Sequence, residues 1–197
     1  MNRPVQQLRE ELINPFVSMD SGFTAHQLDK IVELGLASQS HEGRLADGAT
    51  INRTRTCTLS WLLPTPDTQW IFDRVSDCLL SINDQHYKFV LDQYEPLQFT
   101  NYKENRSEFY APHLDAVYGV KSQMTSRKLS LILQLTDPET YDGGELLMYF
   151  GRDKPTPVPK HRGAVVVFPS FMLHEVTPVQ RGRRNSLVTW AHGPLFK

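Results

Sequence analysis

The sequence is poor in the features that mark secreted, membrane-spanning and strongly charged proteins. Its 197 residues contain two cysteines, Cys57 and Cys78, which are too few for a disulfide framework. The first twenty residues lack the apolar stretch of a secretory signal, and no apolar run approaches the ~20 residues of a membrane span. The formal net charge is only -1. These absences favour a soluble, cytoplasmic protein, and we expect one domain over residues 1–197.

The small net charge hides an uneven distribution along the chain. From Phe150 onward eight lysines and arginines stand against two acidic residues. Such a bias can mark a site for an anionic ligand or for nucleic acid, although a solvated basic face is the simpler interpretation. A nucleic-acid-binding module is therefore one alternative, but the interleaving of aromatic and basic residues that is typical of such modules is missing.

Proline is absent from two long stretches of the N-terminal half, residues 16–63 and 67–95. Apolar residues at helical spacing predict helices over 24–36 and 67–82. Later in the chain, short β-rich runs alternate with turns, which predicts strands over 94–102, 111–116, 128–136, 145–150, 163–168, 172–178 and 184–192. The expected fold is mainly β (α+β), with an antiparallel sandwich or jelly-roll core over about 91–197 and a helical support region over about 1–90.

Two histidines and one aspartate could form a metal site. His113 and Asp115 are separated by one residue, and on a strand that spacing puts both side chains on one face. The motif alone is weak, because this composition gives about 0.4 chance occurrences. His174, in a later predicted strand, can complete the two-histidine, one-carboxylate set of non-haem Fe(II) sites.

A basic residue follows His174 at a distance of ten. If the predicted strand is regular, Arg184, Ser186, Val188 and Trp190 face the same side. A guanidinium next to a hydroxyl suits a carboxylate ligand, because the planar guanidinium can bind it bidentately. The alternative is that Arg184 is one of several surface bases around the turn at residues 181–184.

Taken together and in order, these motifs resemble the Fe(II)- and 2-oxoglutarate-dependent oxygenases, specifically the prolyl 4-hydroxylase-like (PKHD-type) branch. The pattern covers about residues 94–194 and reads Tyr102; His113-Leu114-Asp115; the strand 129–136 leading into Asp142-Gly143-Gly144-Glu145; Arg162-Gly163 and the strand 164–168; His174; Pro178-Val179; Gly182; Arg184; Trp190. The resemblance implies a double-stranded β-helix, which is the jelly roll of this family.

The resemblance also implies a role for each motif residue. His113, Asp115 and His174 would ligate Fe(II), and Arg184 would bind the distal carboxylate of 2-oxoglutarate with help from Ser186 and Tyr102. Trp190 would line the cavity. Gln134 stands where the family often has a second tyrosine, so its amide would contact the cosubstrate or the substrate.

The implied activity is a dioxygenase reaction that hydroxylates an amino-acid side chain, with a prolyl residue of a protein favoured, and releases succinate and CO2. Fe(II), 2-oxoglutarate and O2 would take part, with ascorbate as a reductant. We expect a protein or peptide substrate, with a small amino-acid-like molecule as an alternative, and neither nucleic acid nor membrane as a partner; the oligomeric state stays open. A cupin-like metal-binding protein or dioxygenase without 2-oxoglutarate is the second hypothesis. Arg53, Arg55 and Trp61, between the two predicted helices, are open candidates for substrate contact. Tyr110 and Tyr118, which flank the His113-Leu114-Asp115 motif, are either contacts at the cavity rim or ordinary strand aromatics.

Overall fold

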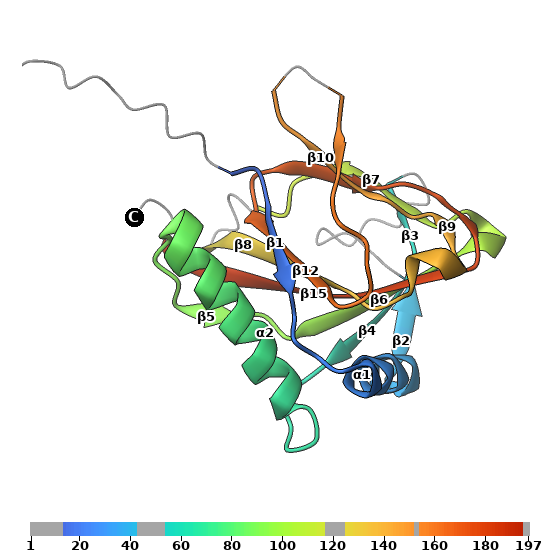
Figure 1. The fold of residues 1–197 in the computed structure, drawn as a ribbon, viewed down its shortest axis with the longest axis horizontal. Helices are drawn as coiled ribbons and strands as arrows, with labels where there is room; N and C mark the ends of the chain where they lie inside the picture. Colours follow the sequence, from blue (N-terminus) through green and yellow to red (C-terminus); the bar gives the residue numbers. More distant parts are fainter. Residues whose placement is uncertain (1–13, 43–53, 117–124, 152–153, 195–197) are drawn as a thin grey trace, which may run out of the picture.

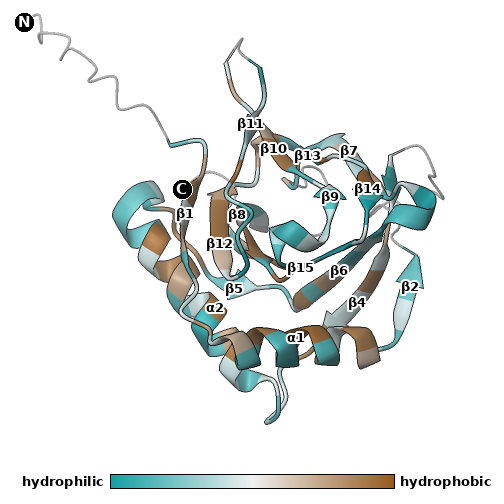
Figure 2. Cartoon of the chain, turned by 45° about the vertical axis from the view of Figure 1, so that its right-hand side comes forward, coloured by the Kyte–Doolittle hydropathy of each residue, from teal (hydrophilic) through white to brown (hydrophobic). Residues whose placement is uncertain are grey.

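Two β-sheets lie face to face, and two helices cover the outer side of the larger one (Figures 1 and 2). This arrangement is seen in a computed structural model that describes residues 14–42, 54–116, 125–151 and 154–194. Among these residues, no helix has the length and apolar character needed to cross a membrane.

All strand pairs that the structure describes are antiparallel. The large sheet has the order β1 (Val17–Asp20), β12 (Ala164–Pro169), β8 (Thr125–Gln134), β15 (Arg183–Pro194), β6 (Leu97–Lys103), β4 (Thr58–Leu62), β2 (Ser40–Glu42), and β5 (Gln93–Tyr94) pairs with β15. The small sheet has the order β11 (Thr156–Pro157), β10 (Leu146–Tyr149), β13 (Leu173–Val176), β7 (Phe109–His113), β3 (Arg55–Thr56). A separate short pair joins β14 (Val179–Arg181) to β9 (Asp142–Gly143).

The described residues contain two α-helices, α1 (Ala25–Ala37) and α2 (Gln69–Ile82), close to the predicted ranges. Thr24 and Gln27 form a capping box at the start of α1, each side chain bonding the other residue's backbone N–H. Gly35 allows α1 to pack tightly on β6, since a Cβ at this position would lie 2.3 Å from the ring of Phe99. The close approach of α1 to the sheet therefore requires glycine at position 35.

Alternate residues of the central strands belong to two different cores. On β12, Val165 and Val167 pack in the core shared with the helices, whereas Val166 and Phe168 pack between the two sheets. This is the two-residue period of a strand that is buried on both faces. The large sheet thus separates a helix-supported core from an inner space, which holds the site described below.

The N-terminal region is less helical than the sequence indicates. Four strands, β1 to β4, lie within the stretch expected to be helical support, in addition to the two helices. They are two to five residues long and join sheets whose other strands lie between residues 93 and 194. Strands this short carry little periodicity of their own, because their pairing partners supply most of their stability. The prediction of one domain over the whole chain stays a prediction.

Candidate metal centre and its cavity

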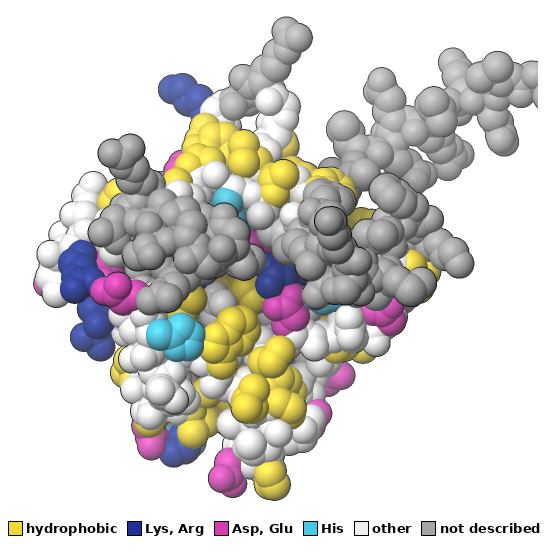
Figure 3. All heavy atoms as spheres, turned by 180° about the vertical axis from the view of Figure 1, so that it is seen from behind, with side chains coloured by type: hydrophobic (Ala, Val, Ile, Leu, Met, Phe, Trp, Pro, Cys, Tyr) yellow, Lys and Arg dark blue, Asp and Glu magenta, His cyan; other side chains and the backbone are white. Residues whose placement is uncertain are grey.

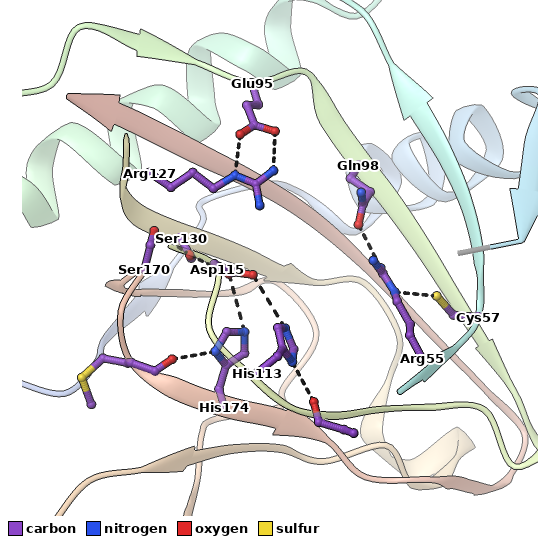
Figure 4. A network of polar contacts seen from close by, with 12 residues as sticks. Arg55, Cys57, Glu95, Gln98, His113, Asp115, Arg127, Ser130, Ser170 and His174 are labelled. Atoms are coloured by element: carbon purple, nitrogen blue, oxygen red, sulfur yellow. Dashed lines mark hydrogen bonds and ion pairs between the residues drawn. The ribbon is translucent and has the colours of Figure 1, made fainter. Parts of the chain in front are cut away.

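His113, Asp115 and His174 come together between the two sheets (Figure 4). The Nε2 atom of His113 lies 3.7 Å from Oδ1 of Asp115, and Nε2 of His174 lies 3.5 Å from Oδ2. One nitrogen or oxygen atom from each residue falls within 4.8 Å of the others. The three atoms therefore surround one position that a metal ion could occupy.

The backbone orients both imidazoles toward that position. His113 and His174 lie opposite each other on the paired strands β7 and β13. In each, Nδ1 lies 2.8–2.9 Å from the carbonyl oxygen two residues earlier, that of Ala111 or Met172. Because a carbonyl only accepts, Nδ1 must carry the proton, and Nε2 keeps its lone pair for a metal. This is the tautomer that the site requires.

Asp115 reaches the site from a loop. The sequence predicts that it shares a strand with His113, but β7 ends at His113, and that expectation is wrong. The backbone N–H of Asp115 donates to the carbonyl of Ser170 at 2.9 Å, and the Ser130 hydroxyl donates to Oδ2 at 2.7 Å. A second hydroxyl, that of Ser170, lies 3.0 Å from the Ser130 oxygen. These bonds hold the carboxylate in place without a regular strand.

The environment of His113 and Asp115 favours the form in which each binds a metal. Burial lowers the pKa of His113 below its usual range, and the neighbouring imidazole of His174 lowers it further. Burial alone would raise the pKa of Asp115, but the two histidines and the Ser130 hydroxyl outweigh it, so the net shift is downward. A neutral imidazole and an ionised carboxylate are the forms that bind a metal, so the residues present fit an Fe(II) ion.

Arg184 lies at the same cavity, and its side chain is only 1% exposed. One terminal nitrogen donates to Oε1 of Gln134 at 2.9 Å, and the other lies 3.4 Å from the hydroxyl of Ser186. The guanidinium carbon is 5.6 Å from the ring centre of Tyr102. No carboxylate pairs with Arg184 among the described residues, so its charge is buried without a counter-charge there.

The cavity between the sheets measures about 440 Å³. As the strand alternation predicts, Arg184, Ser186, Val188 and Trp190 all line it, together with Tyr102 and the three candidate metal ligands. Apolar side chains complete the wall: Ile132, Leu146 and Val176. A charged ligand group and a metal could thus share one partly enclosed cavity.

Several contacts of this cavity have no counterpart in the motif pattern. Ser130 on β8 has no motif, but it lies two residues from Ile132 and four from Gln134, so alternation places all three on the cavity face. Tyr141, just before the Gly143-Gly144 turn, is 1% exposed, and its phenol interacts electrostatically with Arg184. A tyrosine in an acidic turn gives no such signal in the sequence.

The open candidates for substrate contact divide in two groups. Arg55 and Trp61 line the cavity, as does Tyr110, whose ring stacks on His113 with centres 3.4 Å apart. Arg53 and Tyr118 lie outside the described residues. Arg127 also lines the cavity: it packs 3.8 Å from the ring of Trp190.

Lysine and arginine side chains do not form a continuous stripe among the coloured residues of the face shown in Figure 3. There, lysine and arginine side chains lie next to aspartate and glutamate. Two of the bases are in ion pairs, Arg162 with Asp29 and Arg181 with Asp142. The charge bias therefore corresponds in part to ordinary surface pairs, and on this face nothing favours a nucleic-acid interface.

Fold and site together define a class of protein. Two facing antiparallel sheets that hold two histidines and one carboxylate, with a buried arginine nearby, form a double-stranded β-helix of the non-haem Fe(II) type.

Comparison with known proteins identifies the family. The model of the 2OG-Fe(II) oxygenase superfamily matches residues 97–192. A PKHD-type hydroxylase of Maricaulis maris is 42% identical over 82 residues, which are 41% of this chain and 35% of the relative. A PKHD-type hydroxylase of Teredinibacter turnerae is 30% identical over 152 residues, or 73% of this chain and 65% of the relative. The chain spans about two fifths of the length of most of the curated relatives it matches.

Solved structures agree on the fold. A prolyl-4-hydroxylase of Pseudomonas putida superposes with a TM-score of 0.74 at 21% identity, covering 91% of this chain and 93% of the other. A prolyl hydroxylase from Trichoplax adhaerens, solved with a hypoxia inducible factor peptide fragment, gives 0.70 at 16% identity, covering 90% and 83%. The chain belongs to the 2OG-Fe(II) oxygenase superfamily, which confirms the predicted family and the predicted jelly roll. Membership implies Fe(II), 2-oxoglutarate and O2 as the cofactor set.

Proposed function

We propose that this chain is an Fe(II)- and 2-oxoglutarate-dependent dioxygenase that hydroxylates an amino-acid side chain, with a prolyl residue of a protein as the favoured target, and releases succinate and CO2. The observation that carries the proposal is the buried guanidinium of Arg184, which shares a cavity with a metal-ligand triad and has no carboxylate partner among the described residues. Burying an unpaired charge costs several kcal/mol. An anionic cosubstrate offsets that cost.

Each residue has a defined task in this proposal. His113 and His174 would hold Fe(II) through Nε2, and Asp115 through its carboxylate. The bound ion would supply the oxidising chemistry that 2-oxoglutarate and O2 drive. Arg184 would bind the distal carboxylate of 2-oxoglutarate, because a guanidinium matches a carboxylate bidentately.

The neighbours of Arg184 would set the position of that carboxylate. Gln134 accepts from Arg184 and so orients the guanidinium, while the Ser186 hydroxyl and the aromatic side chains of Tyr102 and Tyr141 lie around it. Trp190 forms part of the wall, and apolar residues exclude water from the reacting groups. A cytoplasmic location, a protein partner and the use of ascorbate belong to the same proposal.

The test measures cosubstrate binding before turnover. Anaerobic protein with Fe(II) should develop a visible charge-transfer band on addition of 2-oxoglutarate, because the keto acid chelates the ion. Arg184→Gln should raise the dissociation constant of 2-oxoglutarate about 100-fold, the loss of a charge-assisted contact in a buried site. Arg183→Gln is the matched control, since Arg183 is adjacent but exposed.

Two outcomes would count against the proposal. A metal-loaded protein that gives no band with 2-oxoglutarate would favour the cupin-like alternative, which binds metal without this cosubstrate. An equal effect of the Arg183 and Arg184 substitutions would remove Arg184 from the cosubstrate site. Turnover is then followed as succinate formed from labelled 2-oxoglutarate with prolyl peptides.

A further inference from the structure

A second buried arginine lines the cavity beside the metal-ligand triad. Arg55 lies on β3 and is 9% exposed. It stands opposite Tyr110 of β7, the strand that carries His113. Its guanidinium carbon is 4.5 Å from the centre of the Tyr110 ring, and the same ring stacks on His113. One aromatic ring therefore links Arg55 to a candidate metal ligand.

The partners of Arg55 are all neutral. Its Nε donates to Sγ of Cys57 at 3.0 Å, and one terminal nitrogen donates to Oε1 of Gln98 at 3.0 Å (Figure 4). Burial raises the pKa of Cys57, which keeps it a thiol. A guanidinium has five N–H donors, and these two contacts use two of them. Among the residues that the structure describes, no carboxylate pairs with Arg55.

A third arginine of the same cavity, Arg127, can be compared with Arg55 and Arg184. Arg127 also lines it, but Glu95 binds Arg127 with both carboxylate oxygens, at 2.5 and 2.7 Å. Arg55 and Arg184 have no such partner within the described ranges. Because a buried cation without a counter-charge is costly, this cavity is suited to two anionic groups. One 2-oxoglutarate supplies a distal carboxylate for Arg184 only.

We infer that Arg55 binds a carboxylate of the substrate, so that the substrate of this site is a carboxylate-bearing molecule. The inference rests on the proposed function, in which Arg184 takes the cosubstrate. Arg55 lines the same cavity as His113, Asp115 and His174, so a group held by Arg55 shares that cavity with the metal position. The carboxylate has two sources: the terminal carboxylate of an amino acid or peptide, or an acidic side chain next to the hydroxylated residue.

The experiment compares acids with their uncharged amides. Protein loaded with Zn(II), which does not turn over, and saturated with 2-oxoglutarate is titrated by calorimetry with two matched pairs. The first pair is N-acetyl-L-proline and N-acetyl-L-prolinamide, which tests a terminal carboxylate. The second is acetyl-Glu-Pro-amide and acetyl-Gln-Pro-amide, which tests an acidic side chain. We expect the acid of one pair to bind about 10- to 100-fold more tightly than its amide, and the pair identifies the source.

Substitutions assign the preference to Arg55. Arg55→Gln should bring the ratio of acid to amide affinity to within twofold of one, and Arg55→Lys, which keeps the charge, should retain part of it. Arg181→Gln is the control, because it removes one positive charge from an exposed surface pair outside the cavity. It should leave the ratio unchanged, which excludes a general effect of net charge.

Three results would overturn the inference: equal binding of acid and amide in both pairs, an acid preference that survives Arg55→Gln, or a loss of 2-oxoglutarate binding in Arg55→Gln that equals the loss in Arg184→Gln. The last would place Arg55 in the cosubstrate site. Affinity for Zn(II) and 2-oxoglutarate is measured first in every variant. A wild-type protein that binds no 2-oxoglutarate contradicts the proposed function, and an acid preference in that protein still reports on Arg55.

Discussion

Removing the hydroxyl of Ser130 should weaken metal binding although Ser130 is not itself a ligand. Ser130 is fully buried, and its hydroxyl donates to Oδ2 of Asp115 at 2.7 Å. A hydrogen bond to a charged group contributes about 1.5–3 kcal/mol. In Ser130→Ala, bulk water cannot readily replace the donor, so the carboxylate loses that orientation. If this free energy is lost from metal binding, the dissociation constant of the metal rises about 10- to 100-fold.

Ser170 provides a graded control for this prediction. Its hydroxyl lies 3.0 Å from that of Ser130 and donates to it when Ser130 donates to Asp115. Ser170→Ala therefore removes a bond between neutral groups, worth about 0.5–1.5 kcal/mol, and should weaken metal binding by at most about tenfold. The backbone carbonyl of Ser170, which accepts from the N–H of Asp115, stays in place.

The assay is an anaerobic competition titration of Fe(II) against a chelator of known affinity, with thermal unfolding of the metal-free proteins as a check on folding. The expected order of affinity is wild type, then Ser170→Ala, then Ser130→Ala. A Ser130→Ala protein that binds Fe(II) within twofold of wild type, or one that binds more tightly than Ser170→Ala, would refute the idea that this hydroxyl orients the ligand.

Three further predictions concern cosubstrate, pH and packing. Tyr141→Phe removes a hydroxyl that interacts electrostatically with Arg184 and should raise the dissociation constant of 2-oxoglutarate about 3- to 10-fold in a binding titration, with Fe(II) affinity unchanged. Burial alone would raise the pKa of Glu95, but its arginine and histidine partners give a net lowering, so its ionised form stabilises the fold above pH 4.5, and this contribution is lost as the pH falls further. In chemical denaturation, the stability difference between wild type and Glu95→Gln should shrink below pH 4.5; a constant difference would contradict this. Gly35→Ala should lower the free energy of unfolding by about 1–3 kcal/mol, because the new Cβ meets Phe99, and a stabilised variant would show that helix propensity outweighs the clash.

The sequence predicted the motif-bearing strands better than the strands at the sheet edges. The run that became β12 is uniformly apolar, and the alternation from Arg184 to Trp190 survives in β15, so their periodicity reflects burial on defined faces. Strands β2 and β3 have only two or three residues each. Such short segments are strands because another strand pairs with them. A local sequence pattern cannot predict pairing with a strand elsewhere in the chain.

The candidate site shows the same division. The spacing of His113 and Asp115 correctly brought both side chains to one place, but a loop anchored on Ser170 holds Asp115 instead of a strand. Tyr141 and Ser130 contact the site through tertiary packing, and neither belongs to a recognisable motif. Motifs could predict the residues expected to contact the metal and the cosubstrate. They could not predict the residues that contact those side chains.

The two faces of the large sheet divide stability from function. On β8, Leu131 and Leu133 pack in the core beneath the helices, while Ser130, Ile132 and Gln134 face the inner space. The outer face can therefore gain stability from apolar burial alone. The inner face carries buried polar groups that bond to the Asp115 carboxylate and to the Arg184 guanidinium. Buried polar and charged groups lower the stability of the fold unless each has a bonding partner. It follows that metal and cosubstrate should stabilise this protein by acting on the inner face, and that substitutions on the outer face should change unfolding without changing the affinity for either.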